Sequence, residues 1–160
     1  MAALQFAFTW HGYRGPRGTF QAEAHVALSQ TLDGLAGGLE TRVRREAPVS
    51  PASSNPPGQS PGRLRAGLKV KAHHHGNGGD IELTSDMPYT KYVIRGRGEV
   101  RARPGGFLRF FLGGRWVYAK RVRAVPPNDF IGRAVKDYRP QVQQHLGRLT
   151  AAIAEAFFSE

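Results

Sequence analysis

The chain has 160 residues, enough for one domain with a modest core, and its lack of cysteine excludes disulfide bonds and thiolate zinc sites. Its 23 basic residues (Lys and Arg) outnumber its 12 acidic residues (Asp and Glu), and the net charge is +11. This balance favours a polyanionic neighbour such as nucleic acid, a membrane surface or an acidic protein, unless it only reflects an arginine-rich composition.

The N-terminal part predicts a short strand followed by a long helix. Apolar residues alternate strictly at the start, which is typical of a strand with one apolar face: Leu4, Phe6, Phe8 and Trp10. From Thr19, the expected N-cap, apolar residues recur at steps of three and four until Pro48 ends the helix. Three glycines within this pattern each cost about 1 kcal/mol relative to alanine and predict a kink: Gly34, Gly37 and Gly38.

Residues 48–62, PVSPASSNPPGQSPG, contain five prolines and no charged residue. Such a segment cannot form a core of its own, and a loop of this length inside a compact domain is usually either functional or disordered. We expect an arm that is mobile in the free protein and becomes ordered on contact with a neighbour.

A β region follows the arm. Apolar alternation predicts strands in five segments: 68–72, 81–83, 89–95, 107–112 and 116–122. Residues 73–79 are expected to form the first turn, and Gly113-Gly114 is a strong two-residue hairpin signal. We expect one antiparallel sheet of four to five strands.

A second long helix is predicted at the C-terminal end. Asn128 or Asp129 caps a run in which apolar residues recur from Ile131 to Phe157, and Pro140 is expected to kink or restart it. The fold class is therefore α+β, a single domain over 1–160 whose sheet packs against two long helices.

The run His73-His74-His75 raises the question of a metal site. Adjacent residues on a strand point to opposite faces, so at most two of the three reach one ion, and the other histidines fall in other elements. We favour a polar hairpin end over metal binding.

Nothing in the sequence matches a catalytic pattern. The acidic residues are scattered, and P-loop, GxSxG and HExxH motifs are absent. We expect no enzyme and no cofactor, with a small nuclease or toxin as a remaining alternative. No apolar stretch approaches the roughly 20 residues of a membrane span, and no secretory signal is recognisable, so we expect a cytoplasmic protein without membrane contact.

Between Lys91 and Arg123 the chain carries ten basic residues and one acid, Glu99, with interleaved aromatic residues. This composition is typical of a face that binds single-stranded DNA or RNA. We favour instead a sheet with one buried aromatic face and one solvated arginine face. The arginines expected to form an electrostatic surface towards DNA or an acidic partner are Arg95, Arg97, Arg101, Arg103, Arg121 and Arg123.

Three segments in fixed order carry a resemblance to a known family. They are Pro48-Val49 with Gly62-Arg63-Leu64-Arg65 after a small-polar loop, then Pro88-Tyr89-Thr90-Lys91-Tyr92-Val93-Ile94 running into Gly96, and finally Pro126-Pro127-Asn128-Asp129-Phe130-Ile131 with Ala134. In this order they resemble the neck or tail-completion proteins of long-tailed (siphovirus) bacteriophages. The loop after Pro48 is longer than in the family and suggests a lineage-specific contact arm, and Ile94-Arg95 replaces an acidic residue before the glycine.

The resemblance implies a virion subunit that joins head to tail at the neck or the head-proximal tail end. It implies a ring, a hexamer in our expectation, with DNA passing through the channel without sequence-specific contacts. The implied partners are copies of the same chain, the tail tube protein, and head-closure or adaptor proteins. We expect Tyr89 and Tyr92 on opposite faces of a strand, and interfaces at Pro48, Pro56, Pro57, Arg63, Tyr89 and Tyr92. A basic nucleic-acid-binding module is the alternative.

Overall fold

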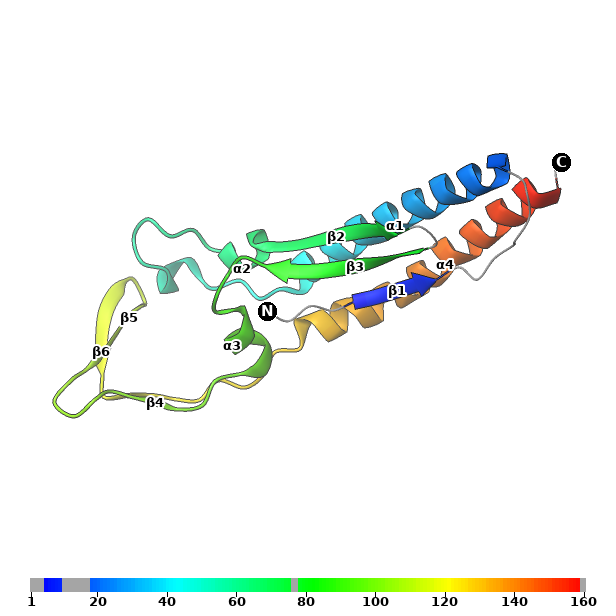
Figure 1. The fold of residues 1–160 in the computed structure, drawn as a ribbon. Coiled ribbons are helices and arrows are strands. Elements are labelled where there is room, and N and C mark those ends of the chain that lie inside the picture. Colours follow the sequence, from blue (N-terminus) through cyan, green and yellow to red (C-terminus); the bar gives the residue numbers. More distant parts are fainter. Residues whose placement is uncertain (1–4, 10–17, 76–77, 159–160) are drawn as a thin grey trace.

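The computed structural model describes residues 5–9, 18–75 and 78–158. Its elements in chain order are β1 (Gln5–Thr9), α1 (Gly18–Glu46), the 3-10 turn η1 (Ala52–Ser54), α2 (Arg63–Ala66), β2 (Leu68–His75), β3 (Gly78–Ser85), α3 (Thr90–Arg95), β4 (Val100–Arg101), β5 (Leu108–Leu112), β6 (Arg115–Ala119), β7 (Arg121–Val122) and α4 (Phe130–Phe158). The two long helices lie side by side, and a three-stranded sheet lies along one side of the pair, where it packs mainly on α1 (Figure 1). Residues 99–123, called here the extension, carry β4 to β7 and project from one end. The α+β class with two long helices is confirmed.

Helix α1 forms because its apolar residues fall on one stripe that faces α4 and the sheet. Four members of this stripe are at most 5% exposed: Leu32, Leu35, Leu39 and Val43. The helix begins at Gly18, one residue before the predicted cap, and runs as one element through the three glycines to Glu46. Pro48 follows its end, as predicted.

Helix α4 supplies the other half of the core. Phe130 and Ala134 are fully buried, and Tyr138 is 3% exposed. Of the two predicted caps, Asp129 is the one used, because its Oδ1 accepts a hydrogen bond from the backbone N–H of Gly132 at 2.9 Å. Pro140 is exposed and lies inside the helix without dividing it, so the predicted restart is wrong.

The central sheet is antiparallel, with the strand order β1-β3-β2. Ile81 and Leu83 of β3 are buried in the core. β1 confirms the predicted N-terminal strand, although Leu4 and Trp10 lie outside the described residues. β2 is an edge strand, and two side chains of α1 form hydrogen bonds with its backbone. The Glu40 carboxylate accepts from the N–H of Val70 at 2.9 Å, and the Arg44 guanidinium donates to the carbonyl of Leu68 at 3.0 and 3.2 Å.

The prediction of one sheet with four to five strands is wrong. The described strands form the three-stranded sheet and two separate two-stranded pairs, β4–β7 and β5–β6. The expected strand at 89–95 is the short helix α3. The expected turn at 73–79 is shorter, because β2 continues through His75 and β3 begins at Gly78.

The hairpin predicted around Gly113-Gly114 is confirmed. β5 and β6 pair in antiparallel register from Leu108↔Ala119 to Leu112↔Arg115. Both turn glycines have positive φ, 61° and 80°, which is the conformation that a two-residue turn between twisted strands requires. Within the described ranges, no helix is long and apolar enough to cross a membrane.

Candidate protein-interaction groove

The short helix α3 is fixed at its start by a buried threonine. Thr90 is 9% exposed, and its hydroxyl donates to the carbonyl of Met87 at 2.7 Å while lying 2.7 Å from the hydroxyl of Ser85. The Ser85 hydroxyl also accepts from the N–H of Met87 at 3.3 Å. These bonds close a turn directly before α3, so the orientation of the helix and of Tyr89 and Tyr92 is set by the core.

The other end of α3 is joined to the segment before α4. Gly96 has a φ of +74°, and a Cβ at this position would lie 2.7 Å from the Val125 carbonyl oxygen and 2.8 Å from the Pro127 nitrogen. Arg97 and Val125 exchange two backbone hydrogen bonds of 2.8 and 2.7 Å, and the N–H of Asn128 donates to Val93 at 3.1 Å. Only glycine allows this close approach.

These contacts create an open groove of about 670 Å³, called here the tyrosine groove. Its walls come from the end of α1, from α3 and from the segment that leads into α4. The lining residues are Pro48, Tyr89, Tyr92, Val93, Arg97, Val125, Pro126, Pro127, Asn128 and Arg133. Each of the three segments that carry the sequence resemblance therefore contributes to one surface.

The groove is lined mainly by aromatic and apolar residues, together with two arginines, Arg97 and Arg133. Tyr89, Tyr92 and Val125 are 39%, 51% and 50% exposed. Arg97 makes no ion pair within the described structure, whereas Arg133 lies 3.6 Å from a Glu46 carboxylate oxygen and donates to Asn128 at 2.8 Å. Exposed tyrosine and arginine are the residue types enriched in the centres of protein interfaces.

The structure brings only part of the predicted interface together. Pro48, Tyr89 and Tyr92 line the groove, but Pro56 and Pro57 lie further along the arm, and Arg63 is exposed at the start of α2. Since α3 is a helix, the two tyrosines are three residues apart and both line the groove, so the prediction of opposite strand faces is wrong.

The structure divides the predicted arginine surface into two groups. Arg97 lines the groove and Arg95 ends α3, whereas the remaining four are exposed on the extension: Arg101, Arg103, Arg121 and Arg123. Arg101 of β4 pairs directly opposite Arg121 of β7. Glu99, the only acid between Lys91 and Arg123, lies 2.6 Å from Arg101 and neutralises part of this charge.

The aromatic residues of the extension do not form the buried face that we favoured. Phe107, Trp116 and Tyr118 are 62%, 43% and 61% exposed. Trp116 packs edge-on against Phe111 at 5.4 Å, and the Arg109 guanidinium lies 4.0 Å from the centre of its ring. The interpretation is wrong because β5 and β6 pair only with each other and never reach the core.

The three histidines alternate across β2, as the strand geometry predicts. His73 and His75 lie 3.2 and 2.6 Å from carboxylate oxygens of Glu82 and Asp80 on β3, whereas His74 lies 3.2 Å from Asp33 of α1. In the part of the chain that the structure describes, no three His, Asp or Glu side chains are grouped so as to hold a metal ion.

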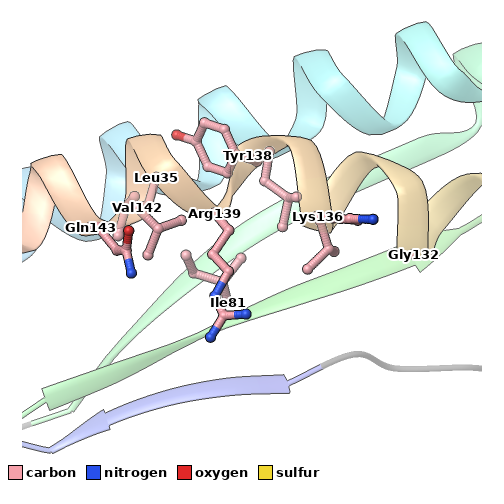
Figure 2. Close-up of a pocket in the computed structure, with 10 residues that line it drawn as sticks. Leu35, Ile81, Gly132, Lys136, Tyr138, Arg139, Val142 and Gln143 are labelled. Atoms are coloured by element: carbon pink, nitrogen blue, oxygen red, sulfur yellow. The ribbon is translucent and has the colours of Figure 1, made fainter.

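A second hollow of about 570 Å³ lies between α1, α4 and β3 (Figure 2). Figure 2 shows Arg139 reaching from α4 towards Ile81, whereas Tyr138 points towards α1. Burial raises the pKa of Tyr138, and the positive charge of Arg42 partly opposes this shift. No carboxylate or histidine is among the residues that line this hollow, and its titratable residues are Lys136, Tyr138 and Arg139.

The sequence interpretation did not name six of the lining residues as site residues: Val93, Val125, Pro126, Pro127, Asn128 and Arg133. A signal was present, since Val93, Asn128 and the residues next to Val125 belong to the second and third segments of the resemblance. The sequence did not show that the chain at Gly96 approaches Val125 and Pro127 and so brings the two segments together. In the comparisons with known proteins, no family model, no curated protein and no solved structure matches this chain.

Proposed function

We propose that this protein is a virion structural subunit of a long-tailed bacteriophage, a neck or tail-completion (tail terminator-like) protein that joins head and tail. The observation that carries the proposal is the tyrosine groove. Three segments separated by tens of residues, which together carry the family resemblance, line one exposed surface. A shared binding surface explains why such segments occur together and in order. In this role the protein catalyses no reaction and carries no cofactor.

The subunit forms a ring, with six copies as the proposed number, around the channel through which DNA passes. A tail tube is cyclic, and a protein that caps it must close through head-to-tail interfaces. The exposed arginines of the extension, which read no sequence, are the surface proposed to face DNA. The net charge of +11 makes dilute subunits repel one another, which favours assembly on the particle over assembly in free solution.

The β5–β6 hairpin supports a role in assembly. A two-stranded hairpin without a sheet or a core is only marginally stable alone in water. This hairpin nevertheless exposes Leu112, Trp116 and Tyr118, a set of large apolar groups that a monomer gains nothing by exposing. We infer that a neighbouring protein covers it in the virion, either the tail tube protein or a head-closure protein.

Imaging and complementation of the phage test this function. Cryo-electron microscopy of virions should locate several copies in a ring at the head–tail joint. A phage that lacks the gene should release filled heads without attached tails. Tyr92→Asp should fail to complement this phage, and Gln144→Asp, on an exposed face of α4, should complement it. A single copy per particle, or density only far from the neck, contradicts the proposal.

A basic nucleic-acid-binding module is the second candidate, and the opposed Arg101 and Arg121 favour it. Glu99 pairs with Arg101, but the described structure gives Arg121 no ion pair, so a polyanion beside the two arginines would relieve their repulsion. If the free protein bound DNA or RNA at nanomolar concentration in physiological salt, this candidate would replace the first.

A further inference from the structure

The β5–β6 hairpin has an outer edge whose backbone groups point away from its own partner strand. Leu112 and Arg115 flank the two-residue turn, so they form the first hydrogen-bonded pair of the ladder. In an antiparallel ladder such pairs alternate with pairs whose backbone groups point outward. Trp116 and Tyr118 belong to the outward-pointing kind, so β6 presents their N–H donors and C=O acceptors on its free edge.

Within the described ranges, nothing pairs with this edge of β6. The strand pairs only with β5, and no backbone hydrogen bond joins Trp116 or Tyr118 to another element. The other edge of the hairpin is different, because the η1 turn of the Pro-rich arm lies next to β5 (Figure 1). The Ser53 carbonyl also accepts from the N–H of Gly114 at 2.9 Å. The edge of β6 is therefore the one open to a partner.

A neighbour that covers the hairpin must supply partners for these backbone groups. Water satisfies them in the free subunit, but a covering protein removes that water, and a buried unpaired group costs free energy comparable to a lost hydrogen bond. The phosphates of DNA accept hydrogen bonds and donate none, so they can satisfy the N–H groups but not the carbonyls. An added β-strand satisfies both kinds of group, and it supplies the third strand that an isolated hairpin lacks.

The charge around this edge indicates an acidic partner. Arg115 begins β6 and Lys120 follows its end, and both are exposed and form no ion pair within the described structure. Residues 100–123 carry seven basic residues and no acidic residue. A second copy of this chain, with its net charge of +11, is repelled by such a surface. A strand with acidic side chains beside Arg115 and Lys120 is instead stabilised by cross-strand pairs of opposite charge.

We propose that an acidic, extended segment of a neighbouring virion protein adds to β6 as a third strand. Its backbone pairs with that of Trp116 and Tyr118, and its carboxylates lie beside Arg115 and Lys120. This inference rests on the function proposed above, since it names the chemistry of the partner that covers the hairpin.

Hydrogen exchange, measured on the free subunit and on purified virions, tests the added strand. The amides of Trp116 and Tyr118 should exchange roughly tenfold more slowly in the virion, because a hydrogen-bonded amide exchanges only when its bond opens. The amides of Arg109 and Phe111 point outward from β5 in the same way and serve as the internal control, so their exchange should change less. Equal protection of both edges, or of neither edge, contradicts strand addition.

The charge of the partner is tested by complementation. Arg115→Glu combined with Lys120→Glu should leave filled heads without attached tails, whereas Arg148→Glu, on the exposed surface of α4, should support normal assembly. The hairpin lies outside the core, so the purified double variant should unfold at the temperature of the wild type. A double variant that assembles normally shows that the partner is not acidic.

A photo-crosslinking residue in place of Tyr118 identifies what lies at this edge in the virion. It should react with an acidic segment of another structural protein. Reaction with DNA, with a second copy of this chain or with a segment that lacks acidic residues overturns strand addition, and the proposed function stands if the protein is found in a ring at the neck. If the protein is absent from the virion, both proposals fail.

Discussion

The ring of Tyr138 on α4 occupies the space directly above Gly38 on α1. A Cβ at Gly38 would overlap the hydroxyl end of this ring. A Cβ built on the neighbouring Gly37 would have no such neighbour within 4 Å. The two glycines therefore differ in role, although the sequence pattern treats them alike. Gly38 permits the close packing of the two long helices, whereas Gly37 lies on an exposed face.

Gly38→Ala should lower the free energy of unfolding, and Gly37→Ala should raise it. Overpacking against Tyr138 costs about 1–3 kcal/mol, which exceeds the gain of about 1 kcal/mol from replacing a helical glycine by alanine. At Gly37 only the gain applies. Urea unfolding of the two variants measures both effects. Equal stabilisation by both substitutions would show that Tyr138 does not pack on Gly38.

Alkaline pH should destabilise the protein through Tyr138. Burial raises the pKa of Tyr138 above its ordinary value of 10.0. The folded state then holds the phenolic proton more tightly than the unfolded state, so the contribution is present below pH 10 and is lost as pH rises through the folded pKa. Tyr138→Phe should show a smaller loss of stability between pH 9 and pH 11 than the wild type. Tyr118→Phe, at an exposed position, should behave like the wild type.

Glu40 should matter more for stability than an ordinary surface carboxylate. It accepts the Val70 N–H at 2.9 Å and pairs with Arg44 at 2.7 Å, so its loss leaves a backbone group of β2 without its partner. Glu40→Ala should cost about 1–3 kcal/mol. Asp86 pairs with Lys69 at 2.6 Å, but both side chains are about half exposed, and Asp86→Ala should cost less than about 1 kcal/mol. Similar losses in both variants would contradict this role of Glu40.

Gly96→Ala should open the tyrosine groove without unfolding the helices. A φ of +74° and the nearby Val125 carbonyl leave no room for a methyl group, and such strain costs about 1–3 kcal/mol. Hydrogen exchange at the amides of Arg97 and Val125 should accelerate, while α1 and α4 stay protected. Gly98→Ala is the matched control, because no atom lies within 4 Å of its Cβ position. Unchanged exchange in Gly96→Ala would mean that the chain relaxes elsewhere.

Sequence periodicity was sufficient for the long helices but not for the arrangement of strands. Over the 29 residues of α1 and of α4, apolar residues at steps of three and four form a continuous stripe only on a helix, and burial of that stripe requires a core. Alternation over a few residues identifies a strand but not its neighbour. The sequence therefore could not show that β5 and β6 stay apart from β3.

The prediction of a strand at 89–95 is wrong, and the sequence contained a sign of the helix that forms there. The side chains least exposed on α3 are Thr90, Val93 and Ile94, whose spacing of three and four is that of a helix. Tyrosine, valine and isoleucine favour strands by composition, but the hydrogen bonds of the Thr90 hydroxyl with Ser85 and Met87, together with Gly96, fix a helical turn. The groove forms only because α3 is helical and because the chain at Gly96 packs against Val125 and Pro127. The sequence therefore predicted some of its lining residues but not that they meet in one groove.

Arg101 and Arg121 should contribute to DNA binding without contributing to stability. They face each other on β4 and β7 with like charge, so Arg121→Ala removes repulsion and should leave the free energy of unfolding unchanged or slightly higher. Arg101→Ala also removes the exposed pair with Glu99, and the two effects are each below about 1 kcal/mol. Binding of DNA by the free protein should be weak at physiological salt, independent of sequence and steeply dependent on ionic strength. Each substitution should lower the logarithmic salt slope by about one, the value for one lost phosphate contact. Arg148→Ala, on the exposed surface of α4, should leave the slope unchanged. If the salt slope is unaltered in both Arg101→Ala and Arg121→Ala, DNA does not bind at this part of the extension.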